Sequence, residues 1–169
     1  MKKFSVNSKS LARIAVIQSL YQYLVLDEEK TVEQIINDIL EYYNNTEQVR
    51  VDYLSSQDYI IQISKNYFQS LFKYIIKERV TITNIINSTL FGNRTFNNKN
   101  SMNLPPLVFT ILCSGVGELK YFPKTSFKVV IDEFTSISTV LLIDHQVSFV
   151  NLALDKLSKV VDSTKLIEN

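Results

Sequence analysis

The sequence predicts an all-α protein, a compact bundle of about seven helices. Glycine and proline, which interrupt regular helices, are rare, with 3 of each among 169 residues. Apolar residues recur along most of the chain at the three- and four-residue spacing of a helix, and not at the alternating spacing of a strand. The loops expected between these segments are mostly short, which favours a bundle, and no internal repeat period is found.

Seven helices are expected from this spacing. They span residues 9–26, 31–43, 58–79, 83–90, 105–121, 126–141 and 146–161. The first carries apolar residues around a wide face, as a largely buried helix does, and the second repeats them at every third and fourth position. Thr31 and Gln34 match a capping box at the start of the second helix. The polar segment 44–57 that follows is expected to form a loop or a weak helical turn.

The middle of the chain is predicted from other local signals. Residues 58–79 have a polar stripe on one side and an apolar face on the other, which predicts an amphipathic helix. A shorter helix is expected at 83–90. Residues 92–103 are rich in asparagine and almost without periodicity, so we expect a mobile surface loop there. Pro105 and Pro106 then suit the start of a helix. Proline has no backbone N–H, and the N–H groups of a first helical turn have no intrahelical partner in any case. Gly115 and Gly117 each cost up to about 1 kcal/mol inside a helix, which predicts that another backbone packs closely against them.

The last two helices follow a turn at residues 123–125. A continuous apolar stripe predicts the final helix. It consists of Val147, Val150, Leu154, Leu157 and Val161. Residues 137–143 are rich in residues that favour strands, so a helix is least strongly indicated at that point.

Length and composition indicate one globular domain over residues 1–169. Hydrophobic residues make up 46% of the chain and charged residues 21%, which allows a sizeable core. No apolar run reaches the roughly 18 residues that span a bilayer, and no signal peptide is evident, so a cytoplasmic protein that does not engage a membrane is expected. Cys113 and His145 are the only cysteine and histidine. Internal disulfides, thiolate-rich zinc sites and two-histidine metal motifs are therefore excluded.

No enzyme motif is present in the sequence. A Gly-x-Ser-x-Gly elbow, a phosphate-binding glycine-rich loop and a carboxylate cluster are all missing. Asp132 and Glu133 are adjacent and diverge on a helix, which argues against a paired general acid and base. Cys113 lies in an apolar helix, where a buried and inert thiol is expected. We therefore expect a binding protein that is not an enzyme and that uses no cofactor and no metal.

The net charge of +1 conceals blocks of opposite charge. Residues 1–26 hold four basic residues and no acid, so that residues 1–13 form a basic arm. Its members are Lys2, Lys3, Lys9 and Arg13. Residues 27–58 hold nine acids against two basic residues, and residues 59–131 again carry a basic excess. Polarised faces of this kind suit binding, although charged helix faces also serve simply to keep a protein solvated.

Both ends of the chain resemble the NusB family. That family's Lys-Val-(Ala)-Ile-(Asn)-Glu helix and its Phe-Val-Asn before a Leu-Asp-Lys ending are similar to FKVVIDEF and SFVNLALDKL. The matching residues are Glu118, Leu119, Lys128, Val129, Ile131, Glu133, Phe149, Val150, Asn151, Leu154, Asp155 and Lys156. The family's first helix is similar to LARIAVIQSLYQY, and its usual Gln-Ala-Leu-Tyr ending is matched at Gln18, Ser19, Leu20 and Tyr21.

This resemblance implies a role in transcription antitermination. NusB-like proteins are helical and bind the boxA segment of nascent ribosomal RNA leaders together with NusE, a ribosomal protein of the small subunit. They help the polymerase resist premature termination. This chain would hold single-stranded boxA-like RNA jointly with NusE and deliver it to the transcription elongation complex, acting as a scaffold.

The implied contacts combine phosphate neutralisation with base stacking, as single-stranded RNA requires. RNA contacts are expected from Lys2, Lys3, Lys9, Arg13 and Phe149. Phe149 keeps a second interpretation, as a phenylalanine of the core. The family motif or a protein partner is expected to use Glu118, Lys128, Glu133, Asn151, Asp155 and Lys156.

Two alternatives stay open. The family's first helix usually opens with a cluster of arginines, which this chain lacks. The first alternative is therefore a diverged helical protein-interaction module, as a monomer or as a homodimer, that has lost RNA binding. Partner binding without salt-sensitive RNA binding would identify it. The other alternative is the NusB-like RNA-binding domain found ahead of some ribosomal RNA methyltransferase domains. No glycine-rich cofactor-binding strand and turn follows residue 169, which argues against it.

Overall fold

The computed structural model describes residues 7–26, 29–45, 61–92 and 104–165 of the chain. Within these ranges it contains seven α-helices and no strand. They are α1 (Ser8–Val25), α2 (Val32–Asn45), α3 (Lys65–Lys77), α4 (Arg79–Phe91), α5 (Pro106–Tyr121), α6 (Phe127–Leu141) and α7 (Asp144–Lys165). The predicted all-α class is confirmed. None of these helices combines the length and the apolar character needed to cross a membrane.

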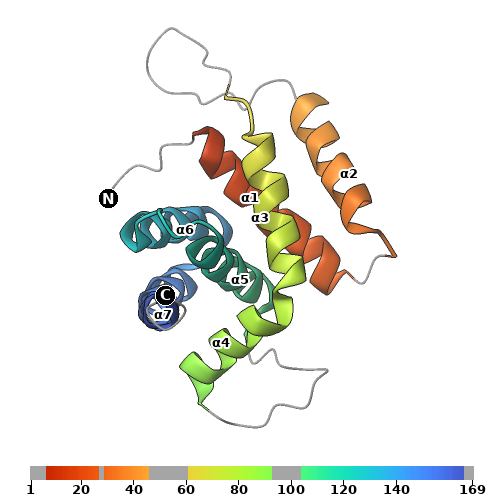
Figure 1. The fold of residues 1–169 in the computed structure, drawn as a ribbon. Helices are drawn as coiled ribbons and strands as arrows, with labels where there is room; N and C mark the ends of the chain where they lie inside the picture. Colours follow the sequence, from red (N-terminus) through yellow and green to blue (C-terminus); the bar gives the residue numbers. More distant parts are fainter. Residues whose placement is uncertain (1–6, 27–28, 46–60, 93–103, 166–169) are drawn as a thin grey trace, which may run out of the picture.

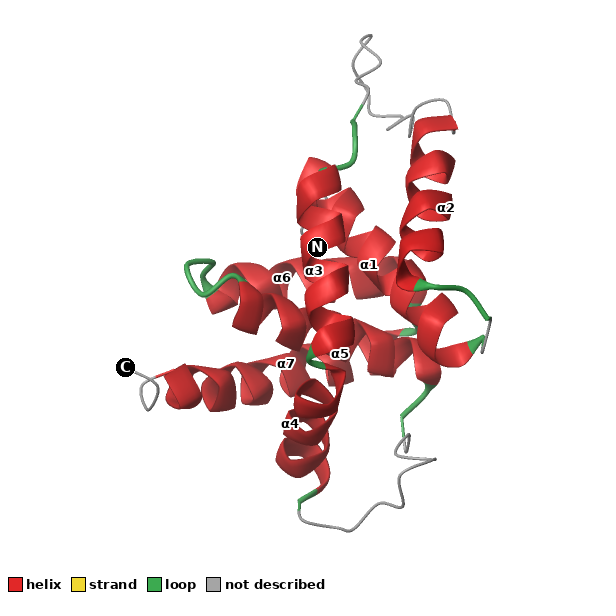
Figure 2. Ribbon diagram, turned by 45° about the vertical axis from the view of Figure 1, so that its right-hand side comes forward, coloured by secondary structure: helices red, strands yellow, loops and turns green. Residues whose placement is uncertain are grey.

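Helix α5 is the centre of the arrangement. Every residue from Val108 to Leu119 is buried, and α5 packs against α1, α3, α4, α6 and α7. Figure 1 shows α1 and α3 on one side of α5, with α6 and α7 on the other side and α4 beyond its end. Figure 2 shows α2 at the outside of the molecule, where it packs only against α1 and α3. All seven helices contribute buried apolar residues to the core.

Local capping explains where the first two helices begin. The side chain of Asn7 accepts hydrogen bonds from the backbone N–H groups of Lys9 and Ser10, at 2.9 and 3.0 Å. Thr31 and Gln34 form the predicted capping box. The backbone N–H of Thr31 donates to Gln34 Oε1 at 2.8 Å, and the N–H of Gln34 donates to Thr31 Oγ1 at 3.2 Å.

The helices in the middle of the chain differ from the prediction. Residues 61–64 are not helical, and α3 begins only at Lys65. The reason is tertiary, because Ser8 at the start of α1 donates its hydroxyl to the carbonyl of Gln62 and its own carbonyl accepts from the N–H of Ser64. These bonds hold the segment away from a helical path.

The observed ends of the other helices differ less from the predicted ends. Helix α4 begins at Arg79, with one residue between it and the end of α3, and ends at Phe91; Gly92 caps it with a φ of 71°, which favours glycine. Helix α7 begins two residues earlier than predicted, at Asp144. Helix α6 continues to Leu141 despite the strand-favouring composition of its end. Most of the polar segment 44–57 and of the predicted loop 92–103 lies outside the described residues, so both stay predictions.

The two glycines of α5 are contact points, as predicted, but side chains and not a backbone pack against them. A Cβ at Gly115 would lie 2.6 Å from Cδ2 of Leu154 in α7. A Cβ at Gly117 would overlap the Cγ1 atom of Ile75 in α3. Glycine at these positions therefore lets α5 approach both neighbouring helices.

Candidate functional site

Only part of the predicted basic arm lies within the described residues. Lys2 and Lys3 fall outside them. Lys9 is exposed on the first turn of α1, and its ammonium lies 5.5 Å from the centre of the Tyr67 ring. An exposed positive charge beside an aromatic ring suits contact with a nucleic acid. A role for these lysines in binding RNA stays a prediction.

Arg13 lies in the interior, which corrects the expectation that it reaches solvent with the rest of the arm. Its exposed fraction is 4%. Its Nε and Nη2 atoms donate to the two carboxylate oxygens of Glu118, at 2.8 and 2.7 Å. Its Nη1 atom donates to Glu133 Oε2 at 3.0 Å. A buried guanidinium that two carboxylates occupy in this way is not available to a phosphate.

Glu118 and Glu133 thus act within the fold as the partners of Arg13. Glu118 is fully buried, whereas Glu133 keeps 24% of its side-chain surface and also accepts a hydrogen bond from Ser10 Oγ at 2.8 Å. Burial by itself lowers the pKa of Arg13, but the hydrogen bonds and negative charge of Glu118 outweigh it, and the net shift is upward. The network ties α1 to α5 and α6. Charged residues inside otherwise apolar helix segments were the sequence signal for it.

A row of four aromatic rings lies beside this network, between α3 and the end of α5. Tyr67 stacks on Phe122 with ring centroids 4.6 Å apart and planes inclined by only 3°. Phe122 meets Tyr121 edge to face at 4.6 Å, and Tyr121 lies 4.8 Å from Tyr74. We call these four residues the aromatic row. Sequence reasoning missed it, although two adjacent aromatics between lysines in KYFPK were a visible signal.

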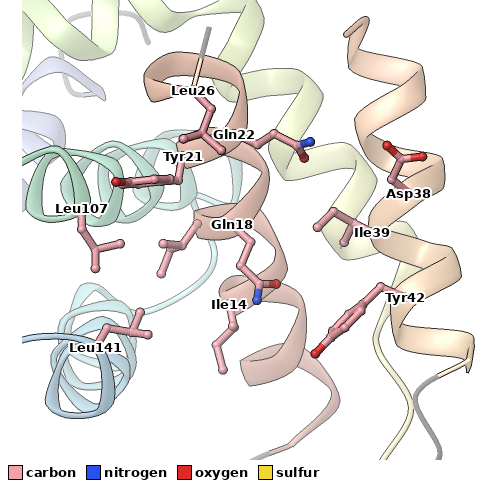
Figure 3. Close-up of a pocket in the computed structure, with 11 residues that line it drawn as sticks. Ile14, Gln18, Tyr21, Gln22, Leu26, Asp38, Ile39, Tyr42, Leu107 and Leu141 are labelled. Atoms are coloured by element: carbon pink, nitrogen blue, oxygen red, sulfur yellow. The ribbon is translucent and has the colours of Figure 1, made fainter. Parts of the chain in front are cut away.

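A groove of about 550 Å³ opens between α1, α2 and the ends of α5 and α6 (Figure 3). Apolar and aromatic side chains dominate its lining. The lining residues are Ile14, Ile17, Gln18, Tyr21, Gln22, Leu26, Asp38, Ile39, Tyr42, Leu107 and Leu141. The rings of Tyr21 and Tyr42 lie toward opposite ends of the groove, on α1 and α2.

One hydrogen bond joins the two helices beside the groove. The hydroxyl of Tyr43 on α2 donates to Gln18 Oε1 on α1 at 3.0 Å. Burial, with a smaller contribution from Tyr42, raises the pKa of Tyr43 to about 12. Three acids are exposed on α2, but Asp38 pairs with Lys30 at 3.2 Å and Glu33 pairs with Lys73 at 3.5 Å. The groove is therefore a mainly apolar site whose one acid is paired with a lysine.

The remaining motif residues lie on α6 and α7. Phe149 is half-buried and packs against the core, so both interpretations of it stay open. Lys128 and Lys156 are exposed. Asn151 accepts a hydrogen bond from the hydroxyl of Thr135 at 3.3 Å, which links α7 to α6. Asp155 accepts one from Lys159 at 2.7 Å. Their use in binding a partner stays a prediction.

The described part of the chain offers no candidate metal site. No three His, Cys, Asp or Glu side chains gather there in a way that could hold a metal ion. Cys113 is buried, as predicted, and burial raises the pKa of its thiol.

Comparison with known proteins gives consistent relatives over the whole chain. The transcription antitermination protein NusB of Rickettsia bellii (strain OSU 85-389) is 33% identical over 158 residues, which cover 94% of each chain. The protein of the same name from Rickettsia rickettsii (strain Sheila Smith) is 32% identical over 167 residues, covering 99% of this chain and all of the relative.

Solved structures share the fold. T. maritima NusB superposes with a TM-score of 0.66 at 23% identity, over 94% of this chain and 93% of that one. A chain from the structure of the antitermination factors NusB and NusE in complex with dsRNA gives a TM-score of 0.66 at 19% identity, over 90% and 97%. The model of the NusB family matches residues 10–159. With a match of this extent and relatives above 30% identity along nearly the full length, the chain belongs to the NusB family.

Proposed function

We propose that this protein is a transcription antitermination factor of the cytoplasm, which binds boxA-type RNA of ribosomal RNA leaders jointly with NusE. It would thereby support processive transcription of ribosomal RNA by the elongation complex. The observation that carries the proposal is the full-length similarity to relatives named transcription antitermination protein NusB. A scaffold of this kind needs two binding surfaces and no reacting group, in line with the absence of enzyme motifs from the sequence.

The start of α1 and the groove beside α2 differ in charge and polarity. The beginning of α1 carries exposed Lys9 and continues into the lysines of the arm, so it attracts phosphates. The lining of the groove beside α2 is mainly apolar and its one acid, Asp38, is paired with Lys30, so it offers little to a polyanion but suits a protein with apolar side chains. We therefore propose that RNA binds at the start of α1 and that NusE binds in the groove.

The strength of RNA binding follows from the cations that remain available. With Arg13 paired inside the fold, Lys2, Lys3 and Lys9 are left in the arm. At about −0.7 per phosphate contact on a single strand, three contacts predict a salt slope of about −2. This is weak binding for the protein alone, which agrees with the need for a second RNA-binding partner.

The test is fluorescence anisotropy of a labelled single-stranded boxA-type RNA, over a salt series, with and without NusE. Binding should strengthen with NusE and weaken with salt, and Lys9→Glu should reduce it. Lys159→Glu makes the same charge change on α7, which has no contact with α1, and should leave RNA binding unchanged. No RNA binding even with NusE present would overturn the proposal and favour the diverged interaction module.

Two further variants test whether NusE binds in the groove. Leu26 lines the groove and is 53% exposed, whereas Ile143 is 60% exposed and does not line it. Leu26→Lys should abolish the gain in affinity that NusE provides while leaving binding of RNA alone unchanged. Ile143→Lys should retain both. Equal effects of the two variants would remove the groove from the proposal.

A further inference from the structure

We infer that the aromatic row extends the RNA-binding surface of the arm, with a base of single-stranded RNA stacked on Tyr121 and the adjoining phosphates held by Lys120 and Lys124. The inference rests on the proposed function and adds to it a second contact region, in a part of the chain where the family motif has no residue.

The rings form a rigid platform. Each neighbouring pair in the row lies between 4.6 and 4.8 Å apart, which is the range of favourable aromatic contacts. Tyr67 and Tyr74 come from α3, and Tyr121 and Phe122 from the end of α5, so two helices fix the row from both sides. A base that stacks there meets a surface that is already ordered, and little conformational entropy is lost on binding.

Tyr121 is the member of the row that a ligand can reach. It is 37% exposed, whereas the other three rings are half-buried. An aromatic ring that is exposed and yet held by neighbouring rings resembles the stacking residues of proteins that bind single strands.

Positive charge surrounds the row. Lys120 and Lys124 flank the two aromatics of α5 in the sequence, and Lys9 lies over the Tyr67 ring at the other end. None of these lysines forms an ion pair within the described residues. Arg13 supplies one positive charge to the two nearby carboxylates of Glu118 and Glu133, and Glu78 follows at the end of α3, so the three lysines outnumber the two negative charges that remain without a paired cation.

This charge decides between nucleic acid and protein as the occupant. Uncompensated lysines beside an exposed ring favour a polyanion with flat bases. The row is also continuous with the proposed RNA site, because Lys9 belongs to the arm and contacts Tyr67. A strand held by the arm therefore leads directly onto the row.

The test replaces the base and measures stacking directly. A boxA-type RNA carrying 2-aminopurine should lose fluorescence on binding, because a stacked base is quenched. Tyr121→Ala should abolish the quenching at one position of the label and weaken binding about 5- to 150-fold, with the salt slope unchanged. Tyr121→Phe keeps the ring and should retain both signals. Val140→Ala shortens an apolar side chain that is 70% exposed on α6, outside both the aromatic row and the groove, and should leave quenching intact.

The lysines supply an independent measurement. Lys124→Gln in the exposed turn after α5 should make the salt slope less negative by about 0.7, which a purely structural role would not do. Circular dichroism of each variant checks the fold, and this exposed lysine keeps the inference testable if Tyr121→Ala unfolds.

The outcomes separate the two proposals. If the wild type binds RNA while Tyr121→Ala and Lys124→Gln bind it equally well, the row is not an RNA site, although the proposed function stands. Loss of NusE binding with unchanged RNA binding in Tyr121→Ala would overturn the inference in favour of a protein site. If the wild type binds no RNA with or without NusE, both proposals fall together.

Discussion

Replacing Arg13 by methionine should destabilise the protein by about 3–5 kcal/mol, because Glu118 then stays in the interior without its partner. The structure sets this magnitude. Glu118 is fully buried, and both of its carboxylate oxygens accept from Arg13 at 2.7 and 2.8 Å. Water cannot replace these bonds without opening the contact between α1 and α5. Glu133 contributes less, since it is 24% exposed and keeps its bond from Ser10.

The double variant Arg13→Met plus Glu118→Met distinguishes the loss of a pair from the loss of packing. It removes both buried charges and fills the space with apolar side chains, so it should be more stable than Arg13→Met alone. A coupling energy of at least about 2 kcal/mol is expected between the two positions.

The assay is urea unfolding followed by circular dichroism. The free energies of unfolding of the two single variants and of the double variant are compared, provided that their m-values agree. Additive losses in the double variant would refute the reasoning, because they would mean that the two side chains stabilise the fold independently. A loss below about 1 kcal/mol for Arg13→Met would refute it as well. RNA binding by folded Arg13→Met, corrected for stability, should match the wild type.

Three further predictions concern stability and reactivity. Gly117→Ala should lower the free energy of unfolding by about 1–3 kcal/mol, and by more than Gly115→Ala, since Cγ1 of Ile75 is attached to the branched Cβ and yields less readily than the far end of a leucine; chemical denaturation of both variants gives the ranking. Thr31→Ala should cost about 0.5–2 kcal/mol through loss of the capping box, measured as a shift of the urea midpoint, and Thr31→Ser should recover most of it. The Cys113 thiol should not react with a thiol reagent at pH 8 until urea unfolds the chain, because burial raises its pKa and blocks access; a reaction that proceeds at the free-thiol rate in the native protein would contradict this.

The sequence by itself determined the fold class and most helix ends. Helical spacing of apolar residues and a cap such as Thr31 with Gln34 act within one helix, over a few residues, so they can be read without knowing the packing. The order of FKVVIDEF and SFVNLALDKL likewise pointed to the family that the comparisons confirm.

Only the tertiary structure decided what the charged and aromatic residues do. Arg13 and Glu118 stand 105 residues apart, and no local pattern indicates that α1 and α5 bring them together. No local pattern indicates that Tyr67 stacks on Phe122 either. The same is true of the start of α3, which lies later in the sequence than predicted because Ser8 forms hydrogen bonds with Gln62 and Ser64. The side-chain position of Arg13 on its helix suited either an exposed arm or an interior pair. The packing of the helices places Arg13 in the interior, because the buried carboxylate of Glu118 on α5 requires a cation and α1 supplies it.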